Sequence, residues 1–531
     1  MGGQTETLVA VAPARESSDQ HYVTAAIPLE ALQTTLTTRS RASQHVAPSV
    51  PRLQKATVVL QLSGVNLCSS AVSGCVIVSL PTMAADLSLP ESLAFWPSSV
   101  TSLGTAAALL LAGSVADAFG ARAVELVGCF TIAAFMLGAS GATTGYQLVA
   151  MRAIQGVGAA LHLSSSVALV TQSFPKGKGR NIAFACLGLS QPLGFSFGLV
   201  IGGVLVDAAG WRVGWYLFGG ITLFLSFLGL WALPHDPENL VFQERLVRAK
   251  TKIDWVGALL ASAFMAILCY LLAMLSSDVN VIRNTDTIVL LCFSVLMLPV
   301  FVGWMYRQQR LGRPALIPNS LWKNAPFSAI CGITALSFAA VNAMELFSSL
   351  FFQEIQHLSA LQSSLRILPS LAVGILVGIT SGFFVDRIRA LWLVSVSAAL
   401  TAGSPLLMAL IQPSWPYWTG AFQAQLLCPI NANILFTVGL IIISDVFTED
   451  MQALAGAVFN TSSQFGTALG YAVLQIISTL VTRNHSWMEE THALLEGYRA
   501  SFWALFSFMM TCVVISALGL RKAGKVGLKQ E

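Results

Sequence analysis

The sequence predicts an all-α polytopic membrane protein with fourteen transmembrane helices. Three observations predict it: the composition, the spacing of the apolar runs, and the placement of Lys and Arg. Of 531 residues, 55% are hydrophobic and only 10% are charged, whereas soluble domains carry about 25% charged residues. Fourteen spans of about 20 residues each leave only short connections, so a separate catalytic domain has no room. We therefore expect a protein that is not an enzyme.

Apolar runs bounded by charged residues, Gly and Pro place the individual helices. The predicted spans are 57–80, 95–113, 124–140, 147–170, 182–206, 213–233, 255–275, 287–305, 327–351, 365–385, 391–411, 420–444, 453–480 and 500–519. The twelfth run is the least regular, because Pro429, Asn431 and Asn433 interrupt it.

Basic residues predict the orientation, because cytoplasmic loops of membrane proteins carry an excess of Lys and Arg. With both termini in the cytoplasm, the basic clusters at 176–180, 245–252 and 307–323 all fall on the cytoplasmic side. The opposite side keeps only isolated arginines: Arg212, Arg283, Arg366, Arg483 and Arg499. This asymmetry favours an even number of helices.

The expected domain organisation is two pseudo-symmetric six-helix bundles plus two extra helices. The expected parts are a disordered cytoplasmic tail (1–55), an N-terminal six-helix bundle (56–233), a cytoplasmic linker (234–254), two additional transmembrane helices (255–305), a second cytoplasmic linker (306–326), a C-terminal six-helix bundle (327–519) and a cytoplasmic tail (520–531).

An internal repeat supports the two halves. A Gly-x-x-x-Asp turn with a basic residue close behind occurs at Asp117 and again at Asp386. Pairs of glycines four residues apart occur in the fifth and thirteenth predicted helices, at 194–198 and 466–470. Both correspondences relate a helix to the one eight places later, and parallel repeats of this kind are typical of transporters.

Four motifs in order make the chain resemble the major facilitator superfamily, in particular its fourteen-helix drug:proton antiporter branch. They are the loop after the second helix (113–122), RAIQGVGAA at 152–160, the glycine-rich fifth helix at 188–203, and KIDWVGALL at 252–260. A closer similarity, to fungal aminotriazole-resistance-type and secondary-metabolite efflux transporters, rests on Leu-Pro at 80–81, Trp-Pro at 96–97, RNIAFA at 180–185 and GWR at 210–212.

The resemblance implies a secondary active transporter that exports a small organic toxicant or secondary metabolite in exchange for protons, by alternating access. Fold does not fix direction, so a facilitator or importer of a small polar nutrient is an alternative. A membrane sensor that does not transport is a second alternative.

Candidate gating residues surround the repeated turn. A carboxylate paired with a basic residue across two helices makes a contact that can break when the halves move. The alternative is a static surface ion pair worth at most about 1 kcal/mol. The residues are Gly113, Asp117, Gly120, Arg122, Asp386 and Arg387.

Ionisable residues inside apolar runs are the candidates for proton coupling or for lining a cavity. A charge in the bilayer is costly and faces protein or water. Arg152, Gln155 and His162 lie on one face of the fourth helix, and Glu345 lies deep in the ninth. The alternatives are helix-packing contacts for Arg152, a hydrogen-bonded core role for His162, and a water-facing helix end for Glu345.

The fifth helix matches the antiporter motif, and its small residues permit close helix packing. Its residues are Gly188, Pro192, Gly194, Gly198, Gly202 and Gly203. Leu199 stands where many antiporters carry Pro, and Val72 stands where bacterial relatives often carry Asp. Both departures argue against a proton route copied from those relatives.

Amide side chains in the predicted helices are the candidates for the substrate cavity, although each could equally bond neighbouring helices. They are Gln61, Asn66, Asn431, Asn433 and Gln464. The sequon that begins at Asn484 is a candidate glycosylation site.

The expected partners are a small-molecule substrate, protons and the lipid bilayer. We expect no nucleic acid partner, no cofactor and no metal, and a monomer. The nine cysteines are scattered through apolar runs without a C-x-x-C pair, which argues against a disulfide framework and against a zinc site. The plasma membrane is the expected location, with a vacuolar or vesicle membrane as the alternative.

Overall fold

Among the residues that the structure describes, fourteen helices are long and apolar enough to span a membrane, as the sequence predicted. It is a computed structural model that describes residues 51–90, 93, 96–174, 178–234, 242–277, 281, 283–384, 387–447, 449–485 and 487–521. Residues Met1–Leu53 and Gln54–Glu531 form separate units, and the description below concerns the second. Residues 1–50 of the expected disordered tail and the end of the C-terminal tail lie outside the described residues, whereas residues 52–55 belong to the first helix and correct the expected boundary.

Six long helices form the first bundle: α2 (Arg52–Asp86), α3 (Trp96–Phe119), α4 (Ala121–Ser140), α5 (Gly145–Ser173), α6 (Lys178–Ala209) and α7 (Arg212–Ala232). A connecting segment follows, with α8 (Phe242–Lys252), α9 (Trp255–Ser277), α10 (Thr285–Arg310) and the short helix η3 (Leu321–Lys323).

The second bundle comprises α11 (Ala325–Leu350) with its π-helical extension η4 (Phe351–Ile355), α12 (Ala360–Phe384), α13 (Ala390–Leu410), α14 (Ala421–Leu427), α15 (Ile430–Val446), α16 (Glu449–Asn484) and α17 (Glu490–Gly519). The predicted twelfth helix is thus broken into α14 and α15. The break falls at Cys428 and Pro429, because proline has no N–H to donate and its ring clashes with the preceding turn.

Several helices are longer than their apolar runs predicted. The first extends over 52–86 rather than 57–80, and the thirteenth over 449–484 rather than 453–480. The apolar run marks the part that avoids water, whereas backbone hydrogen bonding continues into the polar flanks. The helix α8 was not predicted, because its polar, basic sequence resembles a linker.

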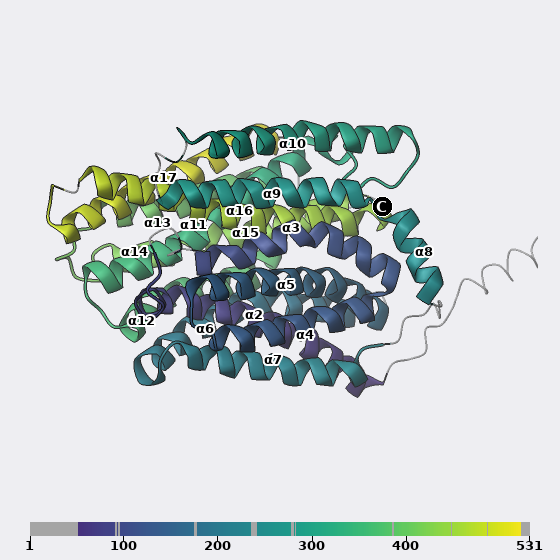
Figure 1. Ribbon diagram of the computed structural model, residues 1–531, viewed down its shortest axis with the longest axis horizontal. Helices are drawn as coiled ribbons and strands as arrows, with labels where there is room; N and C mark the ends of the chain where they lie inside the picture. Colours follow the sequence, from purple (N-terminus) through teal and green to yellow (C-terminus); the bar gives the residue numbers. More distant parts are fainter. Residues whose placement is uncertain are drawn as a thin grey trace, which may run out of the picture. The chain divides into compact units, whose positions relative to one another are not determined.

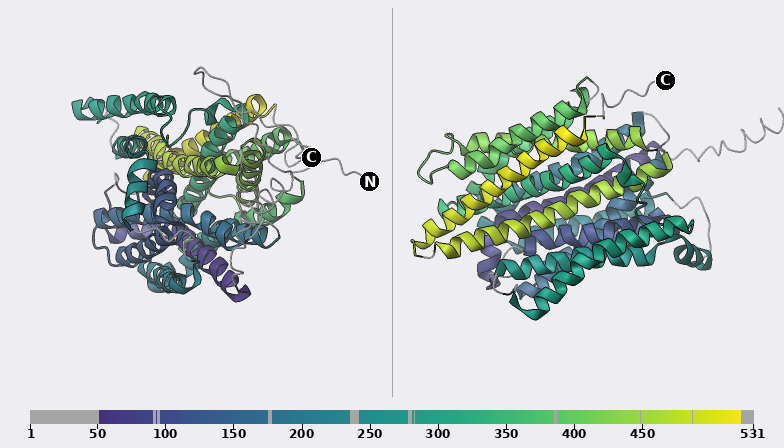
Figure 2. Two further views of the ribbon diagram at one scale, coloured as in Figure 1. Left: turned by 90° about the vertical axis from the view of Figure 1, so that its right-hand side faces the viewer. Right: turned by 90° about the horizontal axis from the view of Figure 1, so that it is seen from above.

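The helices pack as two bundles with a helix pair beside them (Figures 1 and 2). In the first bundle α5 packs against α3 and α4, and in the second α11 packs against α16 and α17. The bundles meet where α3 contacts α16 and α6 contacts α12. The helix α9 contacts both α3 and α16, and α10 packs against α9.

Close packing of α6 on α2 depends on two glycines of the predicted antiporter motif. A Cβ at Gly194 would overlap the backbone of Leu67, and a Cβ at Gly198 would overlap the backbone of Ala71. Only a residue without a side chain allows the two backbones to approach this closely.

The second bundle repeats this contact. A Cβ at Gly466 of α16 would overlap the backbone of Ala335 of α11, and a Cβ at Gly470 would overlap Ala339. The glycine pairs that suggested a sequence repeat therefore perform the same task in both halves, which confirms the pseudo-symmetry.

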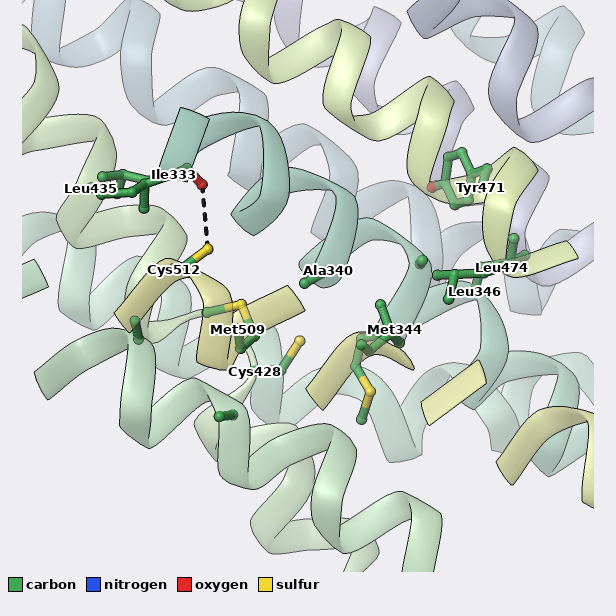
Figure 3. Close-up of a cluster of buried hydrophobic side chains, with 14 of the residues drawn as sticks. Ile333, Ala340, Met344, Leu346, Cys428, Leu435, Tyr471, Leu474, Met509 and Cys512 are labelled. Carbon is green, nitrogen blue, oxygen red and sulfur yellow. Dashed lines mark hydrogen bonds between the residues drawn. The ribbon is translucent and has the colours of Figure 1, made fainter. Parts of the chain in front are cut away.

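A buried apolar core fills the second bundle between α11, α15, α16 and α17. Met344, Leu346 and Leu474 are at most 3% exposed, and the Sγ of Cys512 lies 3.8 Å from the backbone oxygen of Ile333 (Figure 3). This core fixes the helix α11, which carries Glu345.

Asp254 anchors the additional helix pair. Its Oδ1 accepts hydrogen bonds from the backbone N–H of Gly257 and from Nε1 of Trp304, both at 2.9 Å. Its Oδ2 accepts from the backbone N–H of Leu316 at 3.3 Å. The KIDW segment thus joins the start of α9 to α10 and to the loop beyond it.

We expect the substitution Gly198→Val to prevent close packing of α2 and α6. Adding atoms to a well-packed contact typically costs about 1–3 kcal/mol. At Gly198 the added atoms would meet the backbone of Ala71, which cannot move aside as the tip of a side chain can. The amount of monodisperse protein and its thermal unfolding midpoint in detergent should both fall. Gly188→Val is the matched control, because nothing lies within 4 Å of a Cβ there; equal losses in both variants would contradict the packing argument.

Candidate functional site

Arg152 is buried in the first bundle, with 1% of its surface exposed. Its Nε donates to the backbone oxygen of Pro97 at 2.9 Å, and its Nη1 donates to Oε1 of Gln155 at 3.4 Å. Its guanidinium carbon lies 5.2 Å from the ring centre of Trp215. Within the part of the chain that the structure describes, no carboxylate forms an ion pair with Arg152. Its charge is therefore balanced by dipoles and an aromatic face alone.

Glu345 is the corresponding buried acid of the second bundle, on α11. It is 5% exposed, and its Oε1 accepts a long hydrogen bond of 3.5 Å from the hydroxyl of Ser370 on α12. One turn earlier, the Nδ2 of Asn342 donates to the backbone oxygen of Phe338 at 2.8 Å. The sequence singled out Glu345 as a carboxylate deep in an apolar run, and it lies in the protein interior.

Tyr471 is a third buried ionisable residue. It lies on α16, which packs against α11 of its own bundle and against α3 of the other, and it is 3% exposed. We call Arg152, Glu345 and Tyr471 the central group. Sequence reasoning missed Tyr471, although it directly follows Gly470 of the internal repeat.

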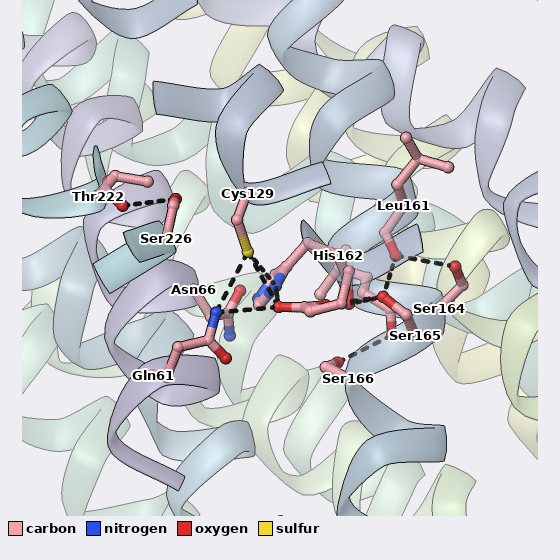
Figure 4. A network of polar contacts seen from close by, with 12 residues as sticks. Gln61, Asn66, Cys129, Leu161, His162, Ser164, Ser165, Ser166, Thr222 and Ser226 are labelled. Carbon is pink, nitrogen blue, oxygen red and sulfur yellow. Dashed lines mark hydrogen bonds and ion pairs between the residues drawn. The ribbon is translucent and has the colours of Figure 1, made fainter. Parts of the chain in front are cut away.

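A buried pair of a histidine and a glutamate lies inside the first bundle (Figure 4). Nδ1 of His162 on α5 is 2.7 Å from Oε1 of Glu125 on α4, and both side chains are at most 1% exposed. The hydroxyl of Ser165 donates to the other carboxylate oxygen at 2.7 Å. His162 is thus a bonded member of a buried network that ties α4 to α5.

Cys129 and Gln61 complete this network, one from α4 and one from α2. The thiol of Cys129 donates to Oε1 of Glu125 at 3.0 Å. The Nε2 of Gln61 lies 3.4 Å from both that oxygen and the Cys129 sulfur. We call Gln61, Glu125, Cys129 and His162 the N-bundle cluster. Glu125 was not singled out from the sequence, although it lies in the predicted third helix one turn before Cys129.

The predicted gating turn is a tight connection between α3 and α4. Gly120 has a φ of +97°, which explains the need for glycine there. Arg122 donates from Nη2 to the backbone oxygen of Leu230 on α7 at 2.5 Å. Asp117 is exposed near the end of α3, and Gly113 has an open side. In the repeated turn, Arg387 is exposed, and Asp386 lies outside the described residues.

The remaining residues of the fifth-helix motif have different surroundings. Pro192 lies within α6, and Gly188 is exposed. A Cβ at Gly202 would lie 2.8 Å from the Cα of Cys75 on α2. Gly203 faces the other bundle, where a Cβ would lie 2.8 Å from the Cα of Leu361 on α12.

The amide side chains predicted for a substrate cavity bond to neighbouring helices. Asn66 donates to the hydroxyl of Ser190 on α6 at 2.9 Å. Asn431 donates to the hydroxyl of Ser337 at 2.6 Å and accepts from that of Ser397 at 2.8 Å.

Three further predicted residues are less enclosed. Asn433 donates to the backbone oxygen of Pro429 at 2.8 Å. Pro429 directly precedes α15, the helix that carries Asn433. Gln464 is half-buried on α16, and Asn484, the candidate glycosylation site, is exposed at the end of that helix.

A family model and individual relatives both match this chain. The family model described as Major Facilitator Superfamily matches residues 62–471. MFS-type transporter 1 of Pyricularia oryzae is 40% identical, over 90% of this chain and 85% of the relative. The methylenomycin A resistance protein of Bacillus subtilis is 30% identical, over 75% and 82%. Efflux pump terJ of Aspergillus terreus is 22% identical, over 82% of each chain.

Solved structures agree on the fold. A bacterial homologue of the human lysosomal transporter Spinster, in an inward-facing and occupied conformation, superposes with a TM-score of 0.62 at 14% identity, covering 89% of this chain and 98% of the other. A D-xylose–proton symporter gives a TM-score of 0.57 at 14% identity, covering 89% and 99%.

We expect Glu125→Ala to destabilise the protein strongly. Each buried donor left without its acceptor costs about 1–3 kcal/mol, and here a hydroxyl, a thiol and an amide lose the carboxylate that accepts from them, while the imidazole loses its partner. The thermal unfolding midpoint in detergent should fall by several degrees. The control Glu496→Ala removes a partly exposed pair with Arg499, which contributes less than about 1 kcal/mol. Similar midpoints for the two variants would contradict a stabilising role for the network.

Proposed function

Because the chain belongs to the major facilitator superfamily, we propose that this transporter exports a small organic toxicant or secondary metabolite in exchange for protons, by alternating access. The names of two relatives, a methylenomycin A resistance protein and an efflux pump, support export. In this proposal the protein acts as a transporter and not as an enzyme.

The central group is the observation that carries the proposal. Glu345 and Tyr471 come from the second bundle and Arg152 from the first, and all three are buried. Ionisable residues buried in a membrane bundle typically mark proton or substrate pathways. Tyr471 lies on α16, which contacts both bundles, so the group is drawn from the elements whose relative movement the proposal requires.

Antiport requires that proton and substrate exclude one another. A carboxyl group such as Glu345 meets this requirement when its ionised form binds a donor group of the substrate and its neutral form does not. Arg152, which has no carboxylate partner among the described residues, supplies a counter-charge while Glu345 is ionised. The proposed proton site is therefore Glu345, with Arg152 and Tyr471 in supporting roles.

The substrate class in this proposal is a neutral or weakly charged amphipathic molecule. Asn433 and Gln464 are half-buried amide residues in largely apolar helices, and sites for small organic ligands combine apolar walls with a few polar groups. The proposal has four further parts. They are a gating role for the turn around Asp117 and Arg122, glycosylation at Asn484, a monomeric state and a location in the plasma membrane.

Transport into inside-out vesicles tests the proposal. Vesicles from cells that produce the protein are given an inside-acid pH gradient and a pooled library of amphipathic metabolites and fungicides. Uptake is measured by mass spectrometry with and without a protonophore. We expect accumulation of a few compounds that the protonophore abolishes. Uptake that only equilibrates and ignores the gradient would instead indicate a facilitator, and the absence of any uptake would favour a sensor.

We expect Glu345→Gln to abolish accumulation driven by the pH gradient, because an amide cannot carry the proton. Exchange of labelled for unlabelled substrate at equal pH should remain, since it requires no proton step. The control Glu490→Gln changes an exposed acid in the first turn of α17 and should leave both activities unchanged. Gradient-driven accumulation that survives in Glu345→Gln would remove Glu345 from the proton route.

A further inference from the structure

We propose that the N-bundle cluster is a binding site for a divalent transition-metal ion of the zinc type. The ligands would be the Glu125 carboxylate, the Cys129 thiolate and the His162 imidazole, with the Gln61 amide oxygen as the fourth. This inference does not depend on the proposed function, because the cluster lies within one bundle and is separate from the central group.

The geometry brings three different ligand atoms together. One ligand atom from each of Glu125, Cys129 and His162 lies within 4.8 Å of the other two. The individual separations are 2.7 Å from imidazole to carboxylate, 3.0 Å from sulfur to carboxylate, and 3.8 Å from sulfur to imidazole. A tetrahedral zinc centre, with bonds of about 2.0–2.3 Å, separates its ligand atoms by roughly 3.2–3.6 Å. Movements of about half an ångström would convert one arrangement into the other.

Gln61 supplies a fourth position. Its Nε2 lies 3.4 Å from the Cys129 sulfur and 3.4 Å from Oε1 of Glu125, whereas its buried Oε1 has no hydrogen-bond partner. Rotating the amide by half a turn places that oxygen where the nitrogen lies, at a ligand-to-ligand distance suited to a tetrahedral ion. The Nε2 of His162 is also buried without a partner. The cluster thus holds more polar groups than its internal hydrogen bonds satisfy.

The charge balance suits a buried divalent ion. A divalent cation, one carboxylate, one thiolate and one neutral imidazole together carry no net charge. Burial penalises net charge, so this ligand set suits an ion in the protein interior. Mixed sulfur, nitrogen and oxygen ligands of this kind suit zinc.

A further contact supports the carboxylate. Ser165 donates to its other oxygen, Oε2, at 2.7 Å, and such outer contacts orient metal ligands.

Cadmium binding to the purified full-length protein in detergent tests this proposal. Cd²⁺ is the probe, because a thiolate ligand gives an ultraviolet charge-transfer band. We expect one saturable equivalent per chain, and X-ray absorption of the complex should give one sulfur with nitrogen or oxygen ligands. Excess Zn²⁺ should displace the Cd²⁺ and raise the thermal unfolding midpoint, since a ligand that binds only the folded state stabilises it.

Single substitutions distinguish this site from other thiols. Cys129→Ser should abolish the charge-transfer band and weaken binding by more than about tenfold. Cys75→Ser is the matched control: Cys75 is buried and its thiol donates to the backbone oxygen of Gly198, so the band should persist. Both variants are compared at equal monodispersity in size-exclusion chromatography.

Three results would overturn the proposal. They are the absence of saturable binding to the native protein, a metal environment with several sulfurs or none, and a band that survives in Cys129→Ser. The first and second need no variant, so a folding defect in Cys129→Ser leaves the proposal testable. In each case the N-bundle cluster would be a hydrogen-bonded network only. None of these measurements involves transport, so their failure is independent of the export proposal.

Discussion

Polar and charged side chains inside this helical unit have no bulk water to bind, so many of them bond to a neighbouring helix. Glu125 bonds to a residue of α5, Asn66 to a residue of α6, and Asn431 to residues of α11 and α13. Each bond joins residues that are at least 34 positions apart in the sequence. The same constraint that makes these residues expensive to bury therefore also specifies which helices are neighbours.

Close helix contact is the second requirement, and glycine meets it in the same way in both halves. The glycines of α6 lie against α2, and those of α16 lie against α11. Tyr471 immediately follows Gly470 on α16, and this helix also contacts α3 of the first bundle. The packing motif and the central group are thus parts of one arrangement, because the small residues determine where the neighbouring aromatic residue lies.

The two groups of ionisable residues differ in their position. The central group involves both bundles, so its environment depends on how the bundles are arranged, which is what alternating access changes. The N-bundle cluster is contained in α2, α4 and α5, and its geometry can persist while the bundles move. A site that couples transport is expected in the first kind of position, and a bound structural or regulatory ion in the second.

The sequence by itself determined the fold class, the number of spanning helices, the internal repeat and the superfamily, because all four depend on local patterns of apolar, basic and glycine residues. It also singled out Arg152, His162 and Glu345, since ionisable residues are conspicuous in apolar runs. It indicated Pro429 as an interruption of the twelfth helix, but it did not find the helix α8 or the roles of Glu125, Cys129 and Tyr471. Their significance depends on which helices are neighbours. The cysteines were judged by their spacing alone, and spacing along the chain cannot reveal that a thiol on α4 lies beside an imidazole on α5. Only the tertiary structure decided this, because those contacts join residues that the chain separates by 33 positions.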